Sequence, residues 1–182
     1  MHYIIGLGNT GASYQNTQHN IAWIIFDSEK ALEWKSEKLL PGELGVFEGD
    51  LYIKPSTFVN NSGKVLPFLK KKGLSHYEDL VVVHDDIDLP FGKIKISYGH
   101  GDGGHNGIKS FIQHAKTKNF IRIRVGVAVE KNGVFYKPNV LAPFDKKALE
   151  EISTVLAPRV FAIIKSLRTE GLEKTMNIFN TK

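Results

Sequence analysis

Several short segments of the chain have the hydrophobic pattern of β-strands. Residues 2–7 and 79–84 are mostly apolar, which is typical of strands that are buried on both faces. Residues 93–98 and 121–128 alternate between apolar and polar side chains, as strands do when only one face is buried. Residues 44–53 predict either one strand or a strand pair.

Other segments repeat apolar residues every three or four positions, which predicts helices. The first helix is expected over Asn20–Trp34, and Ser62 is expected to cap a second one. A third is expected over residues 108–115, after a glycine-rich loop. The last is expected over residues 147–170, where Pro158 predicts a kink.

Strands and helices alternate along the whole chain. This pattern favours an α/β fold in which one sheet carries helices on both faces. The 182 residues contain no internal repeat, low-complexity segment or linker, and their number fits one domain of ordinary size. Residues 1–182 are therefore expected to form a single domain.

Composition excludes several kinds of chemistry. The chain contains no cysteine, so disulfides, thiolate nucleophiles and cysteine-ligated zinc are excluded. No signal peptide is visible, and no apolar run approaches the roughly 20 residues that a membrane span requires. We therefore expect a cytoplasmic protein without a membrane partner, and we expect it to be a monomer.

The net charge of +5 is unevenly distributed. Residues 1–60 carry −3, residues 61–125 carry +5, and residues 126–182 carry +3. This basic excess suits a polyanionic partner if the charges share one face of the protein. Lysines that are merely solvated on the surface are an equally good explanation.

Two pairs of basic residues fall on predicted strands. Lys93 and Lys95 share one face of a strand because side chains alternate, and Arg122 and Arg124 share one face of another. Facing pairs of this kind could bind phosphate. Exposed lysines on an edge strand would give the same pattern.

A glycine motif follows the first predicted strand. Gly6, Gly8 and Gly11 match the G-x-G-x-x-G pattern of dinucleotide-binding proteins. In those proteins a helix starts within the motif, whereas residues 13–20 are too polar to form it. We therefore expect no nucleotide cofactor. The glycines permit a tight turn that places Asn9 at the carboxyl end of a strand, where α/β sheets bind ligands.

Three polar clusters lie where predicted strands end or helices begin. They comprise residues 19–20, 84–86 and 105–106, and each contains a histidine. A lone histidine in such a place is more often a helix cap or a surface residue. Because three clusters occupy equivalent positions, we expect them to converge and to share a function.

Two chemistries could use this set. A metal-assisted hydrolase would take ligands from His19, Asp85, Asp86 and His105. Alternatively, a histidine oriented by a carboxylate would activate water directly as a general base. The chain has neither an H-E-x-x-H metal spacing nor a G-x-S-x-G nucleophile elbow. The sequence favours the general base and leaves the metal open.

Five asparagines also lie beside predicted element ends: Asn9, Asn20, Asn60, Asn61 and Asn106. Asparagine is common there as a turn or cap residue. If these neutral amides met in one cleft, they could orient a carbonyl, a water molecule or a ribose hydroxyl without adding charge.

Taken together, these segments resemble bacterial-type peptidyl-tRNA hydrolase over about residues 3–170. Five motifs carry the resemblance and occur in the family's order and spacing. They are GLGNTGASYQNTQHN (6–20), KPSTFVNNSG (54–63), HDDIDLPFGKIKI (84–96), GGHNGIKS (103–110) and FIRIRVGV (120–127).

The resemblance implies a twisted, mixed sheet and hydrolysis of the ester that joins a peptide to the 3′ end of tRNA. It implies no cofactor and no metal. It also implies that His19 is the catalytic base and that Asp85 is its partner. The substrate-binding residues that it implies are Asn9, Tyr14, Asn20, Phe58, Asn60 and Asn106.

For tRNA phosphate, the resemblance implies binding by basic residues on two strands, one of them Arg124. The other position falls at Ser97, which has no charge, so Lys95 on the same strand face is the expected substitute. Residues 99–104 and the kinked helix over 147–170 resemble a mobile cover over the cleft.

Two functions from other classes remain open. One is a metal-dependent phosphoesterase that uses His84, Asp85 and Asp86, and inhibition by a chelator would favour it. The other is a non-catalytic RNA-binding domain, which an absence of turnover would favour.

Overall fold

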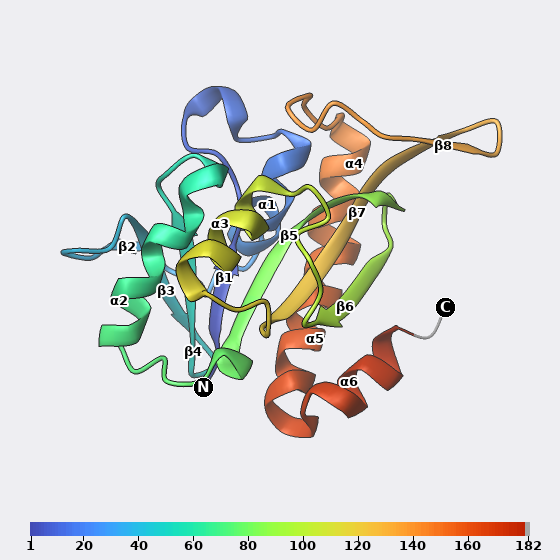
Figure 1. Ribbon diagram of the computed structural model, residues 1–182. Coiled ribbons are helices and arrows are strands. Elements are labelled where there is room, and N and C mark those ends of the chain that lie inside the picture. Colours follow the sequence, from blue (N-terminus) through green and yellow to red (C-terminus); the bar gives the residue numbers. More distant parts are fainter. Residues whose placement is uncertain (181–182) are drawn as a thin grey trace.

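An eight-stranded mixed sheet forms the centre of the structure, a computed structural model that describes residues 1–180 (Figure 1). The strands are β1 (Tyr3–Gly6), β2 (Lys35–Ser36), β3 (Gly42–Phe47), β4 (Asp50–Pro55), β5 (Leu80–Pro90), β6 (Ile94–Tyr98), β7 (Ile121–Lys131) and β8 (Val134–Tyr136). Their order is β2-β3-β4-β1-β5-β7-β6, and β8 pairs with β7. Neighbours among β4, β1, β5 and β7 are parallel, and the outer pairs are antiparallel.

Helices cover both faces of this sheet, as the sequence predicts (Figure 1). They are α1 (Ile21–Asp27), α2 (Leu66–Lys71), α3 (Asn106–Ala115), α4 (Lys146–Glu151), α5 (Ala157–Glu170) and α6 (Leu172–Phe179). Short 3-10 segments span Ala12–Tyr14, Gln18–Asn20, Val59–Val65 and Tyr77–Asp79. No helix within residues 1–180 has the length and apolar character needed to cross a membrane.

Alternate residues of β5 contribute to two hydrophobic cores. Val81 and Val83 belong to the core that contains the buried faces of α1 and α5. Leu80 and Val82 belong to the core on the other face, which contains α2 and α3. Because both faces are buried, this part of the strand is continuously apolar. Each aliphatic side chain removed from water contributes roughly 1.5–3 kcal/mol to stability.

The first helix is shorter than its sequence pattern predicts. We expected it over Asn20–Trp34, but α1 ends at Asp27. The Ser28 hydroxyl donates to the Ile24 carbonyl, and the chain then turns, with Leu32 N–H donating to the Glu29 carbonyl. Leu32 is therefore buried by a chain reversal, which imitates helical spacing in the sequence.

Ser62 is not a helix cap. It lies buried inside the 3-10 segment Val59–Val65, and α2 starts only at Leu66. The tight segment packs directly on α3, where a Cβ at Gly63 would lie 2.5 Å from the Ser110 carbonyl oxygen. A regular helix starting at Ser62 was therefore the wrong prediction.

The last predicted helix is divided. A π-helical segment, Ile152–Leu156, separates α4 from α5, and Pro158 lies in the first turn of α5. Proline cannot donate a backbone hydrogen bond, so the irregular turn precedes it as expected. The short helix α6 follows and had no prediction from the sequence.

The strand predicted over residues 79–84 continues as β5 to Pro90, with a register irregularity after Asp86. The neighbouring β1 ends earlier, because its last residue, Gly6, pairs with Val83. Residues 84–86 therefore extend past the end of β1. Beside this extension, His19 at the start of α1 and His105 at the start of α3 both contact Asp85.

The register irregularity in β5 leaves no room for a side chain at Gly126 on β7. A Cβ at Gly126 would lie 2.0 Å from the Pro90 carbonyl oxygen, and that backbone cannot yield as a side chain can. Gly126→Ala should therefore reduce the free energy of unfolding by about 1–3 kcal/mol, as overpacking does. Urea unfolding followed by circular dichroism measures this.

Gly101→Ala is the matched control, because a Cβ at Gly101 meets nothing within 4 Å. Its unfolding midpoint should equal that of the wild type. An unchanged midpoint for Gly126→Ala would contradict the close approach of β5 and β7.

Candidate active site

His19 lies in the 3-10 segment that leads into α1, and its side chain is buried. Its backbone N–H donates to the Val140 carbonyl at 2.8 Å, and the N–H of Gln18 donates to the Ala142 carbonyl at 3.1 Å. Residues 139–144 thus hold the backbone of the segment that carries His19. This contact could not be predicted from the sequence, because residues 139–144 have neither helical nor strand periodicity.

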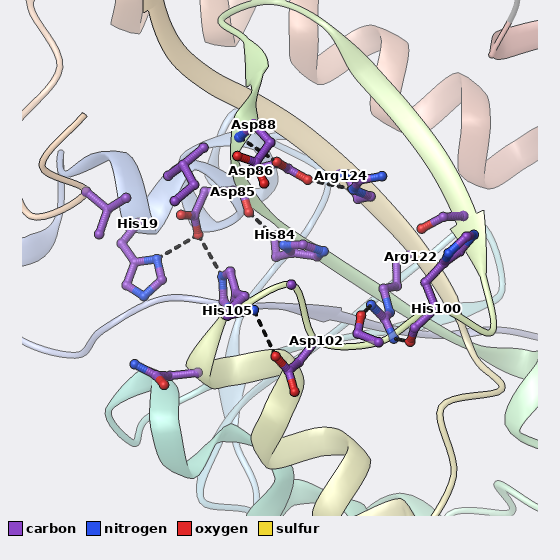
Figure 2. A pocket seen from close by; sticks show the side chains of 17 residues that line it. His19, His84, Asp85, Asp86, Asp88, His100, Asp102, His105, Arg122 and Arg124 are labelled. Carbon is purple, nitrogen blue, oxygen red and sulfur yellow. Dashed lines mark hydrogen bonds and ion pairs between the residues drawn. The ribbon is translucent and has the colours of Figure 1, made fainter. Parts of the chain in front are cut away.

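Asp85 on β5 is the centre of the histidine cluster. His19 Nδ1 lies 2.6 Å from Asp85 Oδ1, and His105 Nε2 lies 3.0 Å from the same oxygen. Figure 2 shows the two rings approaching this carboxylate from different elements, the start of α1 and the start of α3. The convergence of the three polar clusters is therefore confirmed.

The Asp85 carboxyl is ionised despite its burial. Only 2% of the residue is exposed, and burial by itself raises the pKa of a carboxyl. The charge of His105 and the hydrogen bonds from His105 and His19 act in the opposite direction and hold the pKa of Asp85 below its usual value. An ionised carboxylate only accepts hydrogen bonds, so both ring nitrogens that face it are donors.

His105 also forms the N-cap of α3. Its Nδ1 accepts hydrogen bonds from the backbone N–H groups of Gly107, at 3.1 Å, and Ile108, at 3.3 Å. The sequence placed His105 in a polar cluster but did not predict this capping role. The signal was present, because the residue directly precedes the third predicted helix.

His84, beside Asp85 on β5, is the third histidine of the cluster and is buried. Its Nδ1 donates to the backbone carbonyl of Asp85 at 2.7 Å, and its ring lies 4.7 Å from that of His105. Burial, and then the nearby charge of His105, lower the pKa of His84 well below its usual value. His84 is therefore neutral at physiological pH.

Asn9 and Asn20 join the end of β1 to the start of α1. The Asn20 side chain accepts from the Asn9 backbone N–H at 2.8 Å and donates to the Asn9 carbonyl at 2.9 Å. Asn9 Oδ1 accepts from the Val59 N–H at 2.9 Å, which attaches the 3-10 segment Val59–Val65. Among the described residues, Asn9 Nδ2 makes no hydrogen bond, so it can donate to a ligand.

A cavity of about 470 Å³ opens beside the histidine cluster. Of the sequence-predicted site residues, His19, Asp85, Asn106 and Arg124 line it. Asn60 and Phe58 are exposed outside this lining, and Phe58 makes an edge-to-face contact with Tyr14 at 6.1 Å. The predicted site residues therefore fall into two groups. One group lines the cavity, and the other, with the Tyr14–Phe58 contact, forms an aromatic surface outside it.

The glycine-rich loop 99–104 forms one wall of the cavity, but the divided C-terminal helix does not (Figure 2). The buried face of α5 packs in the core on the α1 side of the sheet, and none of the described residues of α4 or α5 lines the cavity. The expectation that this helix covers the cleft is wrong.

Two arginines, Arg122 and Arg124, line the cavity together with the acids Asp86, Asp88 and Asp102. Arg124 Nε donates to Asp86 Oδ2 at 2.5 Å, and only Nε of this guanidinium is hydrogen-bonded within the described chain. Lys95 is exposed and lies directly opposite Arg124 in the β6–β7 register. These two cations therefore occupy neighbouring places on one sheet face.

Arg122 serves a different purpose from Arg124. It is buried, and its terminal nitrogens donate to the backbone carbonyls of Gly101, at 2.5 Å, and His100. Burial, and then the nearby charge of Arg124, lower the pKa of Arg122 to about 10. Ser97, opposite Arg122, is buried as well and also lines the cavity.

Metal ligands could come from one group of the described residues. One ligand atom each from His19, Asp85 and His105 lies within 4.8 Å of the others. His105 meets Asp85 with Nε2 while Nδ1 caps α3, so both of its nitrogens already have partners. The alternative set with His84 and Asp86 is not assembled, because Asp86 binds Arg124 and the Asp88 N–H.

A family model described as peptidyl-tRNA hydrolase matches residues 3–182. The chain belongs to the peptidyl-tRNA hydrolase family. The resemblance that the five sequence motifs indicated is thereby confirmed.

Similar members of the peptidyl-tRNA hydrolase family cover the chain from end to end. The peptidyl-tRNA hydrolase of Bacillus subtilis is 40% identical over 98% of both chains. That of Aliarcobacter butzleri is 34% identical over 100% of both. The crystal structure of the Acinetobacter baumannii peptidyl-tRNA hydrolase has a TM-score of 0.83 at 25% identity and covers 100% of this chain and 95% of that one.

For this member of the peptidyl-tRNA hydrolase family, the Asn9–Asn20 contact predicts that Asn20 is required for stability. Asn20→Ala would leave a buried N–H and a buried carbonyl of Asn9 without partners. An unsatisfied buried polar group costs about 1–3 kcal/mol. Urea unfolding should therefore show that Asn20→Ala lowers the free energy of unfolding by at least that amount.

Asn61→Ala is the control, because the Asn61 amide makes one contact, of 3.3 Å, with exposed Asn60. It should unfold at the wild-type midpoint. If Asn20→Ala unfolds like the wild type, the Asn20 amide is free for substrate instead.

Proposed function

We propose that this protein hydrolyses the ester between a peptide, or an N-blocked aminoacyl group, and the 3′ end of tRNA, with His19 as a metal-free general base. The observation that carries the proposal is the 2.6 Å contact of His19 Nδ1 with ionised Asp85 beside a cavity that Arg124 also lines. Family membership supports the substrate.

In this mechanism, Asp85 keeps the proton of His19 on Nδ1. The other ring nitrogen, Nε2, then has a free lone pair that accepts a proton from water while the water oxygen attacks the ester carbonyl. Asp85 stabilises the imidazolium that forms. The proton then passes from Nε2 to the departing 3′ oxygen of tRNA, which releases the peptide as a carboxylic acid.

Amide donors stabilise the negative charge that develops on the carbonyl oxygen. The backbone of Asn9 is bonded to Asn20, the residue that follows His19, and Asn106 lines the cavity at the start of α3. We assign the donor role to Asn9 Nδ2 and to the Asn106 amide. Neutral donors of this kind stabilise an oxyanion without trapping the charged product. Tyr14, Phe58 and Asn60 form the adjoining surface, to which we assign the peptide.

The tRNA backbone binds on the other side of the cavity. Lys95 and Arg124 lie opposite each other on β6 and β7, and the outer nitrogens of both face solvent. Arg124 is oriented by Asp86, whereas Lys95 is flexible. We assign a single tRNA phosphate to this pair.

His19→Ala should reduce hydrolysis of an N-acetyl-aminoacyl-tRNA by on the order of 10² to 10⁴, because a general base typically contributes that much. Release of the labelled acyl group in acid-soluble form measures the rate. His76→Ala, a change at an exposed histidine just before the 3-10 segment Tyr77–Asp79, is the matched control and should keep the wild-type rate.

The same assay distinguishes the metal-free mechanism from the metal-dependent alternative. Wild-type turnover should persist after dialysis against a chelator and should not rise with added zinc. Turnover that disappears with bound metal and returns with it would overturn the metal-free mechanism, and wild-type turnover by His19→Ala would overturn the base.

Lys95→Ala should raise the Michaelis constant for full-length tRNA substrates and make it less sensitive to salt. Each lost phosphate contact should reduce the slope of log affinity against log salt by about 1. A minimal substrate that ends at the 3′ nucleotide should show no change, since it lacks the phosphate.

Lys165→Ala is the control for charge alone, because Lys165 is exposed on α5, which packs on the other face of the sheet. It should leave the salt slope unchanged. Equal slopes for Lys95→Ala and the wild type would show that Arg124 holds the phosphate without Lys95.

A further inference from the structure

The carboxylate that orients His19 is shared with a second histidine. Asp85 Oδ1 lies 2.6 Å from His19 Nδ1 and 3.0 Å from His105 Nε2. We propose that His105 is a positioning residue that weakens the hold of Asp85 on the protonated form of His19, and so keeps His19 a free base near neutral pH. The proposal rests on the proposed function, since it concerns the same base.

The backbone of α3 fixes the tautomer of His105. Backbone amides can only donate hydrogen bonds, so His105 Nδ1, which accepts from Gly107 and Ile108, carries a lone pair. The single proton of the neutral ring is therefore on Nε2, and it is donated to Asp85. One end of the ring thus caps a helix while the other end contacts the carboxylate.

The same arrangement opposes protonation of His105. A proton on Nδ1 would replace both hydrogen bonds to the helix with contacts between like partial charges. It would also place a positive charge at the N-terminus of the ten-residue helix α3, the end that favours negative charge. His105 therefore donates to Asp85 through Nε2 and accepts from the helix at Nδ1.

The surroundings leave Asp85 as the charge that both rings face. From β5, His84 stacks edge-on against His105 at 4.7 Å and is itself neutral. The other charged groups that line the cavity are Asp86, Asp88, Asp102, Arg122 and Arg124. Asp86 is paired with Arg124, and Asp88 with Lys137, so neither acid replaces Asp85 as the partner of the two histidines.

Because His19 and His105 donate to the same oxygen of Asp85, each weakens the interaction of the other with that oxygen. Each N–H that donates to Asp85 Oδ1 withdraws part of its negative charge, which makes the oxygen a weaker acceptor for the other donor. Without His105, the full charge of the carboxylate would favour the imidazolium form of His19. His19 would then stay protonated, and inactive as a base, to a higher pH.

Two substitutions separate the two ends of the His105 ring. The amide of asparagine reaches the position of Nδ1, so His105→Asn keeps a good N-cap and loses the donor to Asp85. The longer glutamine places its amide nitrogen near the position of Nε2, so His105→Gln keeps the donor and loses the cap. His76→Asn is the matched control, because it makes the same substitution at an exposed histidine outside the cavity lining.

The test is the pH dependence of kcat/KM, together with NMR titration of the His19 ring. For His105→Asn we expect both midpoints to move up by about 0.5 to 1 pH unit, which lowers activity below the midpoint by roughly three- to tenfold, while the alkaline plateau is retained. His105→Gln should keep the wild-type midpoint and show a lower thermal unfolding temperature. His76→Asn should leave the midpoint unchanged.

A purely structural role predicts a different result. If His105 only held Asp85 in place, His105→Asn would lower the alkaline plateau, and the midpoint would stay or move down; either outcome overturns the proposal. The NMR titration does not depend on turnover. A wild-type protein that leaves peptidyl-tRNA intact therefore contradicts the proposed function, whereas an unmoved His19 midpoint contradicts only the role of His105.

Discussion

A buried carboxylate at the end of a parallel sheet is the constraint on which this site depends. Asp85 is almost fully enclosed, and an isolated carboxylate there would take up a proton to avoid the cost of desolvation. It stays ionised because two imidazole N–H groups donate to one of its oxygens. Those groups come from the starts of α1 and α3, so the packing of both helices must be correct before the charge is tolerated.

Contacts outside the histidine cluster also hold α1 and α3 in the positions that Asp85 requires. The reciprocal amide contact of Asn20 with the backbone of Asn9 fixes the start of α1 against the end of β1. Gly63 permits the close approach of the Val59–Val65 segment to α3, and α3 in turn carries His105. The positions of the histidines are thus determined by backbone packing, and few of the contacts involve flexible side chains.

The sequence predicted the parts of the structure in which local pattern and global packing agree. The central strands were found because β5 is apolar on both faces, and the convergence of residues 19, 85 and 105 was found because strand ends meet at one edge. The length of α1 was overestimated because Leu32 returns to the core through a turn. Ser62 was mistaken for a cap because tertiary packing on α3 imposes a 3-10 conformation that short-range pattern does not encode.

At the site, the features that could not be predicted from the sequence are contacts between segments that are far apart in the chain. No periodicity indicates that residues 139–144 support His19, since that contact is made by backbone groups alone. The double use of His105 is equally invisible, because it depends on which nitrogen each partner meets. Arg122 appeared equivalent to Arg124 on the same strand face, and only the fold distinguishes a buried arginine from one that is open to solvent.

The attachment of the glycine-rich loop has a consequence for how the chain can vary in evolution. Arg122 holds the loop through the carbonyls of His100 and Gly101, which every amino acid possesses. Selection on this attachment therefore acts on position 122 and leaves the side chains at positions 100 and 101 free to diverge. By contrast, Gly99, Gly103 and Gly104 have positive φ angles and resist replacement. Related chains can therefore acquire different chemical groups along this wall of the cavity while its backbone path is inherited unchanged.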